Sequence, residues 1–451
     1  MKIIIAGAGK IGSSIARLLN SEGHDVTLID NNREAITRIA DEMDVICLEG
    51  SATNSDVLLE AGASEADLVV AATEKDEINM ICGITARKLG TKNVIARIRD
   101  HEYLNKVDFL REAFGLNMIV NPEYECAKEI SRILRFPGTG RLDAFSKGSV
   151  EIAAMKVETG DKLDGKQLKE LPQSFGAKVL VSIVERNNEA YIPNGSFTLK
   201  AGDKLSVTGT AKELKKFFAV TGYYKKPVRT VLIMGGGRVS IYLAGLLNEV
   251  GIKVTIIERN RELCEKLCEL MPEARIICGD ATRSEVLYEE GINSTDAFVA
   301  LSGDDGNNII TSMFVKSCPV DKIITKVSHT QYPEVINATG LDTIVSPQTT
   351  VAQQLARYVR AMSDSADGSM ETLYKLADEK AEAIEFIIGG DSRCNYKPLK
   401  ELRLKQNVLI AFVIRGKNSI IPDGETALQP GDHAIICAKA GKIKSLDDIL
   451  A

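Results

Sequence analysis

Two glycine-rich segments are the parts of this chain whose residue types and spacing point most directly to chemistry. Residues 2–12 read KIIIAGAGKIG, and residues 230–240 read TVLIMGGGRVS. In each, an apolar run typical of a buried strand leads into the glycines and then into a run typical of a helix. In that setting G-x-G-x-x-G predicts a phosphate-binding turn, because backbone N–H groups and the positive end of the helix dipole face the ligand.

The first turn has the complete pattern. Gly7 permits the tight turn, Gly9 lets the backbone approach a pyrophosphate, and Gly12 lets helix and strand pack closely. Asp30 ends the second apolar run, where a carboxylate can accept hydrogen bonds from both ribose hydroxyls and repels a 2′-phosphate. The turn therefore predicts a nucleotide site. The alternative is a vestigial fold of the same type with an empty crevice.

The second turn departs from this pattern at one glycine. It keeps Gly235 and Gly237, but Ser240 stands at the third glycine position and Glu258 stands where the first copy has Asp30. Serine is small enough for the helix to pack on the strand. A second site is therefore predicted, and the exchange leaves its occupancy open.

Further polar residues fall where they would surround the same crevices. They are Lys10 and Arg238 in the turns, Thr53 and Thr282 after the third apolar run, Thr73 and Ser302 after the fourth, and Arg97 and Lys326 within the fifth. Lys10 and Arg238 could reach a phosphate or could be solvated cations. An arginine in an apolar strand is costly to bury unpaired, so Arg97 predicts either a phosphate or an internal carboxylate as its partner. Asp280 has Ser51 as its counterpart, so the two pockets are expected to differ in charge.

An alternating pattern of strands and helices supplies the scaffold for these residues. Residues 1 to about 135 contain short Val/Ile-rich runs at 3–6, 26–29, 45–48, 68–71, 94–98 and 118–120, with helical segments between them. This alternation predicts an α/β fold with a doubly wound parallel sheet. The pattern returns at an offset of about 229 residues, and a match sustained over the whole length is an internal tandem duplication.

Each half also contains a smaller segment with a different pattern of predicted secondary structure. Between 179 and 209, strand-like runs are separated by turn residues, which predicts a small, mostly antiparallel module, and a similar sequence recurs near the C-terminus. The breaker Phe136-Pro137-Gly138 marks a boundary. The predicted domains are residues 1–135, 140–222, 229–363 and 370–451.

Composition excludes several classes of protein. A net charge of −6 gives no basic footprint for nucleic acid, and no run of 18 apolar residues could span a bilayer. The sequence opens directly on a strand, and nine unpaired-looking cysteines fit a reducing cytoplasm. Cys264 and Cys268 lie four residues apart on a predicted helix, but they lack a second ligand pair, so we expect no metal site.

An NAD-dependent oxidoreductase is the main alternative function, because it shares the glycine turn. It would need a proton donor or acceptor near the nicotinamide. His24 and His433 are poorly placed for this role. His101 and His329 follow the fifth strand at nearly equivalent positions, where a capping or solvated role is expected. We therefore predict no catalytic residues and ligand binding without turnover.

The motifs together resemble those of the TrkA family, the peripheral nucleotide-binding subunits of Trk-type potassium uptake systems. The resemblance covers essentially the whole chain and rests on KIIIAGAGKIG, LID at 28–30, TEKDEIN at 73–79, IARIR at 95–99, GD at 279–280 and the two P-x-G…GD modules. It implies two RCK nucleotide-binding domains, each followed by a small α+β RCK C-terminal domain. It also implies a non-enzymatic regulatory subunit at the cytoplasmic face of the membrane.

The resemblance also implies ligands, site residues and partners. The cofactors would be NAD(H), with ATP or ADP as further candidates. The first site would comprise Gly7, Ala8, Gly9, Lys10, Ile11, Gly12, Asp30, Thr53, Thr73, Glu74 and Arg97. The second would comprise Gly235, Gly236, Gly237, Arg238, Val239, Glu258, Asp280, Ala281, Thr282, Ser302 and Lys326. Four chains would form a ring of eight RCK domains beneath a membrane-embedded potassium-translocating subunit, with residues 122–134 and 347–362 as crossover helices.

Overall fold

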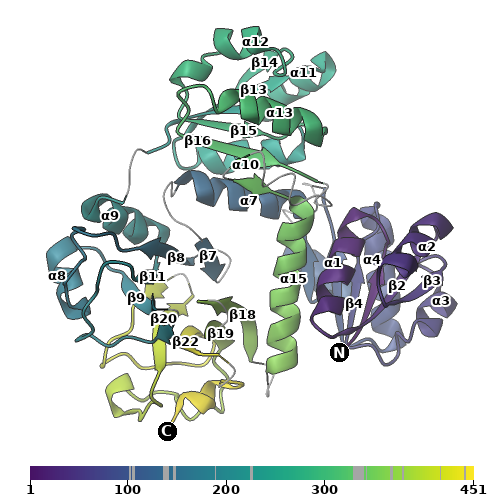
Figure 1. Cartoon of the computed structure of the whole chain (residues 1–451). Helices are drawn as coiled ribbons and strands as arrows, with labels where there is room; N and C mark the ends of the chain where they lie inside the picture. Colours follow the sequence, from purple (N-terminus) through teal and green to yellow (C-terminus); the bar gives the residue numbers. More distant parts are fainter. Residues whose placement is uncertain are drawn as a thin grey trace. The chain divides into compact units, whose positions relative to one another are not determined.

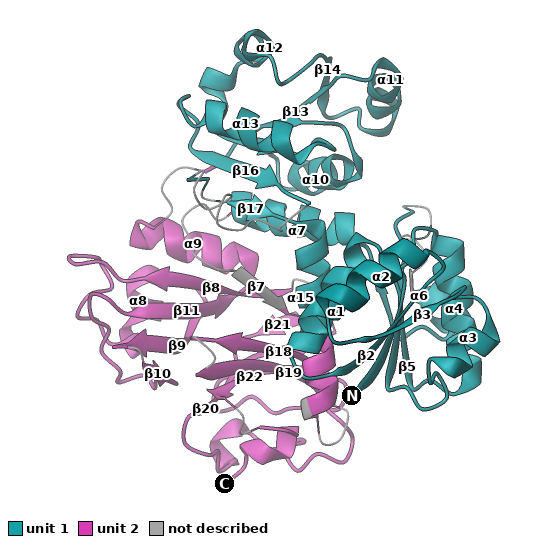
Figure 2. Cartoon of the chain, turned by 45° about the vertical axis from the view of Figure 1, so that its right-hand side comes forward, with its two compact units in different colours: residues 1–134, 228–356 teal, residues 135–227, 357–451 magenta. Residues whose placement is uncertain are grey.

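The computed structural model describes residues 1–100, 103, 107–135, 142–145, 149–187, 189–223, 227–328, 340–341, 343–365, 369–377, 380–416, 418–440 and 443–451. The chain forms two compact units, and each takes residues from both halves of the sequence. The first unit contains residues 1–134 and 228–356, and the second contains residues 135–227 and 357–451 (Figure 2). Among the described residues, no helix is long and apolar enough to cross a membrane.

The first unit contains two six-stranded parallel sheets of the same topology. The first sheet has the spatial order β3 (Ile46–Glu49), β2 (Asp25–Asp30), β1 (Lys2–Ala6), β4 (Leu68–Ala71), β5 (Asn93–Arg97), β6 (Met118–Val120). The second has the order β14 (Arg275–Cys278), β13 (Lys253–Glu258), β12 (Thr230–Met234), β15 (Ala297–Ala300), β16 (Lys322–Lys326), β17 (Ile344–Val345). This is the Rossmann order, so the predicted doubly wound fold and its duplication are confirmed.

Helices cover these sheets on both faces. In the first half they are α1 (Lys10–Ser21), α2 (Arg33–Glu42), α3 (Ser55–Glu60), α4 (Asp76–Leu89), α6 (Val107–Phe114) and α7 (Pro122–Arg135). In the second half they are α10 (Arg238–Asn248), α11 (Arg261–Leu270), α12 (Ser284–Glu289), α13 (Asp305–Val315) and α15 (Pro347–Asp364). The central strands are buried on both faces, which explains their continuous apolar sequences: in β4 all four residues, LVVA, are buried, as are all four of β15.

Helix α7 leaves the first half and packs on the second (Figure 1). Its apolar residues Cys126, Ala127, Ile130 and Leu134 lie in one core with strand β12 and helix α10. It also contacts α15, where the Thr350 hydroxyl donates to a Glu129 carboxylate oxygen at 2.6 Å. The second sheet therefore completes its core with a helix from the first half, as the crossover role implied.

The second unit contains two antiparallel sheets, one from each half. The first has the order β10 (Glu189–Tyr191), β9 (Leu180–Arg186), β11 (Lys204–Gly209), β8 (Val150–Lys156), β7 (Leu142–Phe145), and helices α8 (Leu171–Phe175) and α9 (Ala211–Thr221) accompany it. The second has the order β18 (Met370–Leu376), β19 (Ala381–Ile387), β22 (His433–Lys439), β20 (Val408–Arg415), β21 (Asn418–Ile420). The two sheets share an apolar core that includes Phe145, Ile183, Phe412 and Cys437.

The aspartate of each P-x-G…GD motif has a structural role. Asp203 is buried, and its two carboxylate oxygens accept bonds from Arg186 Nε and an Arg186 terminal nitrogen, both at 2.7 Å. Asp432 and Arg415 repeat this pair at 2.8 and 2.7 Å. Each bidentate pair fixes the turn before the last strand of its module, since the same aspartate also accepts a backbone N–H from that turn.

Candidate nucleotide-binding site

The first glycine turn has the backbone that phosphate binding requires. Gly7 has φ +112°, and a Cβ on it would lie 2.9 Å from the backbone of Ala72 and Thr73. A Cβ on Gly12 would lie 1.8 Å from the Gly7 carbonyl oxygen, so α1 can approach the turn only without a side chain there. Among the described residues, none beyond the chain neighbours of Gly9 has an atom within 4 Å of a Cβ built there, and none caps the N-terminus of α1 with its side chain. The space beside Gly9 is therefore open to a ligand.

The second glycine turn has the same conformation, but the contact between the turn and the following helix is different. Gly235 has φ +94° and lies against Ser302 as Gly7 lies against Ala72 and Thr73. At the third glycine position, the Ser240 hydroxyl donates to the Gly235 carbonyl oxygen at 2.6 Å. The serine thus replaces a close backbone contact with a hydrogen bond, and it does not disrupt the turn.

The acid at the tip of the second strand is bonded to the turn in both halves. Asp30 accepts the Ala8 N–H at 2.6 Å and the Asn32 N–H at 2.8 Å. Glu258 accepts the Gly236 N–H at 2.7 Å and the Asn260 N–H at 2.8 Å. Each carboxylate oxygen retains a lone pair for a ribose hydroxyl.

The size of the second residue of each glycine turn, Ala8 or Gly236, matches the length of the acidic side chain beside it. A Cβ on Gly236 would lie 2.4 Å from Leu267 Cδ1 and 3.3 Å from Glu258 Cβ. Glycine therefore leaves room for the longer glutamate, whereas the first half combines Ala8 with the shorter Asp30.

Buried asparagines fix the ends of the fourth and fifth strands. Asn79 Oδ1 accepts the Thr73 N–H at 2.8 Å and the Thr73 hydroxyl at 2.7 Å, and its amide donates to the Arg97 carbonyl oxygen at 2.8 Å. Asn308 repeats this set with Ser302 and Lys326. Sequence reasoning did not assign these two asparagines to the site; their recurrence at matching positions of the two halves was the available signal for this role.

Arg97 is a buried cation and Lys326 a half-buried one, and both contact backbone carbonyl groups. An Arg97 terminal nitrogen donates to the Thr73 carbonyl oxygen at 3.2 Å, and Lys326 Nζ donates to that of Leu301 at 3.4 Å. Burial lowers the pKa of both side chains. Among the described residues no carboxylate forms an ion pair with either, and Arg97 Nε is buried without a hydrogen-bond partner. A bound phosphate fits the unused donor of this buried guanidinium.

The loops after the third strands differ in charge. The Thr53 hydroxyl lies 2.9 Å from that of Ser51. In the second half Asp280 accepts the Thr282 hydroxyl at 2.7 Å and the Thr282 N–H at 3.0 Å, and these bonds lower the pKa of Asp280. An additional anion therefore stands in the second loop.

One cleft of about 1260 Å³ in the first unit brings many of the predicted residues together. From the first set its lining contains Gly7, Ala8, Gly9, Lys10, Ile11, Asp30, Thr73, Glu74 and Arg97, and from the second set Gly237, Arg238, Val239 and Lys326. The lining does not contain Gly12, Thr53, Gly235, Gly236, Glu258, Asp280, Ala281, Thr282 or Ser302. Lining residues that sequence reasoning missed include Arg38, Arg99 and Glu123. The assignment of all these residues to ligand contacts stays a prediction.

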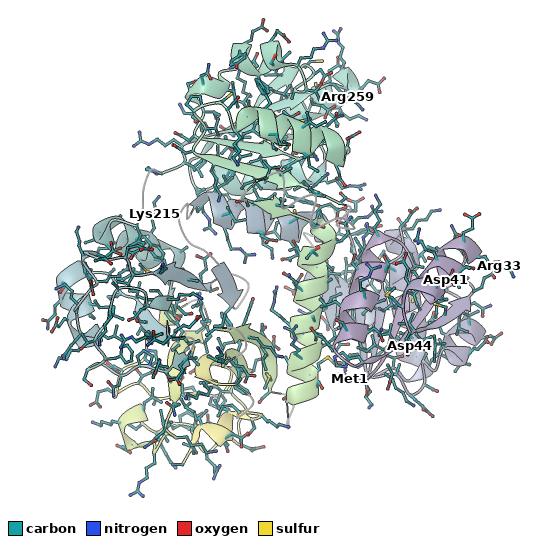
Figure 3. All side chains as sticks on the ribbon, viewed as in Figure 1. Met1, Arg33, Asp41, Asp44, Lys215 and Arg259 are labelled. Carbon is teal, nitrogen blue, oxygen red and sulfur yellow. The ribbon has the colours of Figure 1, made fainter. Side chains whose placement is uncertain are left out.

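Side chains farther from the turns point outward. Arg33, at the start of α2, is 84% exposed and points away from the first sheet (Figure 3). His101 and His329 lie outside the described residues, as does the breaker at 136–138. The described site therefore consists of the two glycine turns, the two acidic residues at the strand ends and the two cations on the fifth strands.

These features define a class of protein with two Rossmann-type domains, each with a glycine turn, and two small antiparallel modules. The TrkA-N domain family matches residues 3–122 and 231–347, and the TrkA-C domain family matches residues 152–222 and 383–451. The chain therefore belongs to the TrkA family, as its motifs indicated. The exact limits of the four predicted domains stay predictions.

Relatives and solved structures agree with this assignment. The chain is 32% identical over 452 residues to the Trk system potassium uptake protein TrkA homolog of Archaeoglobus fulgidus, covering 100% of both. It is 32% identical over 443 residues to Trk system potassium uptake protein TrkA of Haemophilus influenzae, covering 97% of this chain and 95% of the other. The GsuK RCK domain has a TM-score of 0.63 at 20% identity, covering 97% and 92% of the two chains. A structure titled "GsuK channel bound to NAD" has the same score and identity, covering 99% and 78%. The RCK fold is shared.

Proposed function

We propose that this chain is the cytoplasmic regulatory subunit of a potassium uptake system. It binds NAD(H), ATP or ADP in its Rossmann-type domains and transmits the ligand state to a membrane-embedded potassium-translocating subunit. The observation that carries the proposal is the doubled glycine turn, with a cation beside each copy that forms no ion pair among the described residues: Arg97, which is buried, and Lys326, which is half-buried. The names of its full-length relatives supply the transport role.

The geometry supports a division of ligand contacts within each site. The open space beside Gly9 accepts the pyrophosphate, Asp30 accepts the ribose hydroxyls, and Arg97 neutralises phosphate charge. In the second half Gly237, Glu258 and Lys326 take these roles. In each site the ligand phosphate would offset the desolvation free energy of the cation, Arg97 or Lys326. Binding therefore stabilises the conformation in which the strand that carries this cation lies close to the glycine turn.

Regulation then follows from differential affinity. A nucleotide that binds one arrangement of the domains better shifts the population toward it, and different nucleotides in one site bias the partner's gate in opposite senses. We propose that four chains form a ring of eight RCK domains for this purpose. Native mass spectrometry of the purified protein tests the assembly, and a mass other than that of a tetramer would refute it.

Ligand binding is tested by thermal-shift titration with NAD, NADH, NADPH, ATP and ADP. Asp30→Asn and Glu258→Gln should each weaken the affinity for ribose-bearing ligands by about tenfold, because a charge-assisted hydrogen bond is replaced by a neutral one. The matched control is Asp41→Asn, whose exposed carboxylate lies away from the turn (Figure 3). An unchanged shift in Asp30→Asn would remove Asp30 from the site.

The transport role is tested by potassium flux through the membrane partner with each nucleotide present. We expect opposite effects from at least two nucleotides, and identical flux in every case excludes the switch. The alternative, an NAD-dependent oxidoreductase, predicts consumption of NADH with a small substrate. Monitoring NADH absorbance during the same flux assay separates the two, since the regulatory subunit leaves the cofactor unchanged.

A further inference from the structure

Three cysteines lie near the second nucleotide site. Cys264 and Cys268 are on α11, and Cys278 is the last residue of β14. Cys264 is buried, with 6% of its surface exposed, while Cys268 and Cys278 are exposed. The described residues contain no group of three or more metal-binding side chains suited to an ion, so the thiols need an explanation other than metal binding.

Strand register places Cys278 beside Glu258. The parallel pairing of β13 and β14 makes Cys278 the register partner of Glu258. Alternation along the strands puts Val254, Ile256 and Glu258 on one face of the sheet, and Ile276 and Cys278 on the same face. Cys278 therefore faces the side of the sheet on which Glu258 lies.

Helix α11 covers that same face and carries Cys264. Leu267 of α11 belongs to the core that contains Ile256, and Leu263 packs against it. The Cys264 thiol donates to the Glu258 carbonyl oxygen at 3.2 Å. Burial raises the pKa of the Cys264 thiol to about 11. The buried Cys264 thiol thus contacts the backbone of Glu258, and the exposed Cys278 is the register partner of that same residue on the neighbouring strand.

The first half lacks such thiols at the matching positions. Helices α2 and α11 each have ten residues after an asparagine N-cap, and the fourth residue is Ile36 in one and Cys264 in the other. Strands β3 and β14 end on Glu49 and Cys278. Any thiol chemistry here belongs to the second half alone.

We propose that Cys264 and Cys278 form a reversible disulfide that makes the second nucleotide site sensitive to hydrogen peroxide. The Cys278 thiolate attacks the peroxide, an S–O bond forms, the O–O bond breaks, and the leaving oxygen departs as water. The Cys264 sulfur then attacks the resulting sulfenic acid, an S–S bond forms, and the S–O bond breaks with release of a second water. Two thiols supply the two electrons and two protons, and a dithiol reductant reverses the reaction.

Oxidation of the two cysteines would change the position of Glu258, the acid of the second site. A disulfide needs an S–S bond of about 2.05 Å, so the first turn of α11 must move toward β14 and the Cys264 thiol can no longer donate to Glu258. Asn260, the N-cap of α11, donates to Glu258 Oε1, and that carboxylate also holds Gly236. Closure of the disulfide therefore disturbs the acid proposed to bind ribose, and we expect weaker binding at the second site. This consequence rests on the proposed nucleotide-binding function.

The test is non-reducing peptide mapping by mass spectrometry after exposure of the reduced full-length protein to hydrogen peroxide and alkylation of the remaining thiols. We expect a cross-linked pair of peptides containing Cys264 and Cys278, which a dithiol reductant releases. Cys268→Ser should retain the pair, and Cys278→Ser, a change at an exposed position, should abolish it. The proposal is overturned if Cys268 is oxidised without this cross-link, or if the cross-link requires Cys268.

A second measurement tests the consequence for binding. Calorimetric titration of ATP and NADH into the reduced and oxidised protein should show a roughly fivefold or larger loss of affinity at the second site only. The Cys278→Ser variant should show no effect of peroxide. Unchanged affinities in a protein whose disulfide has formed would overturn the regulatory role. If neither redox form binds nucleotide, the proposed function fails, while the peptide map still decides whether the thiols form a disulfide.

Discussion

The hydroxyl of Tyr242 donates a hydrogen bond at 3.0 Å to the backbone carbonyl oxygen of Arg99, a residue 143 positions earlier in the chain. Tyr242 lies one turn into α10, the helix that begins at the second glycine turn. Arg99 follows β5, and its N–H donates to Asp76 at 2.8 Å. The helix that starts at one phosphate-binding turn is therefore bonded directly to a strand end beside the other.

Removing this contact tests its contribution to the first unit. Tyr242→Phe deletes the bonds to Arg99 and to Asn121, and we expect it to lower the free energy of unfolding by about 1 kcal/mol. Urea titration followed by circular dichroism measures the change. Tyr288→Phe, at a half-exposed position on α12, is the control and should have little effect. Equal stability of both variants and the parent would show that the contact contributes nothing.

The third position of each glycine turn gives a matched pair of substitutions. Gly12→Ala puts a methyl group where only 1.8 Å separates it from the Gly7 carbonyl oxygen, and we expect a loss of about 2–3 kcal/mol or more. Ser240→Ala removes one hydrogen bond from a position that already accommodates a Cβ, so the loss should be about 1 kcal/mol. Urea midpoints compare the two, and a larger effect at 240 would contradict this account.

The buried guanidinium should lower stability until an anion binds. Arg97→Met removes a charge that no carboxylate pairs among the described residues, so we expect a ligand-free protein more stable by about 1 kcal/mol. The same variant should show a smaller thermal shift with ATP, since the phosphate loses its counter-charge. Arg33→Met, at an exposed position, should change neither quantity. A less stable ligand-free Arg97→Met protein would indicate that the arginine is structurally paired.

The second unit should show pH-dependent stability that originates at His433. Its Nδ1 lies 2.8 Å from a buried Glu385 carboxylate oxygen, and this hydrogen bond, supported by the charges of Glu385, Glu371 and Asp432, raises the pKa of His433 against the effect of burial. A raised pKa in the folded state stabilises the protein fully below the unfolded value, and the contribution is lost as pH rises through the folded pKa. His433→Gln should therefore lower Tm at about pH 5.5 and have little effect at about pH 8.5. Scanning calorimetry at both values checks this, and an equal change at both would exclude the charged pair.

Much of the fold could be predicted because its signals are local. The Val/Ile runs of β1, β2 and β4 and the glycine spacing of the first turn depend on neighbouring residues, and the structure has strands and a turn there. The duplication then extended each local prediction to the second half. Asp30 and Glu258 were selected from their position at a strand end, and both are bonded to their turns.

The remaining features depend on contacts between distant segments. The placement of Cys278 and Cys264 on either side of Glu258 follows from sheet register and helix packing, so spacing along the chain suggested only the pair Cys264 and Cys268. The bond from Tyr242 to a carbonyl oxygen has no sequence signature, since every residue offers that acceptor. The apolar pattern of its strand likewise could not show whether Arg97 forms an ion pair with a carboxylate, because the residues around its side chain come from several elements.

Joining both copies in one polypeptide has an evolutionary consequence. Because α7 from the first half completes the core of the second, the protein resembles a dimer whose subunits have become covalently fused. In a true homodimer every mutation appears in both subunits and must suit both. Here Ser240, Glu258 and the cysteines of α11 occur in one copy and not in the other, so the two sites can differ in specificity while they keep a common architecture.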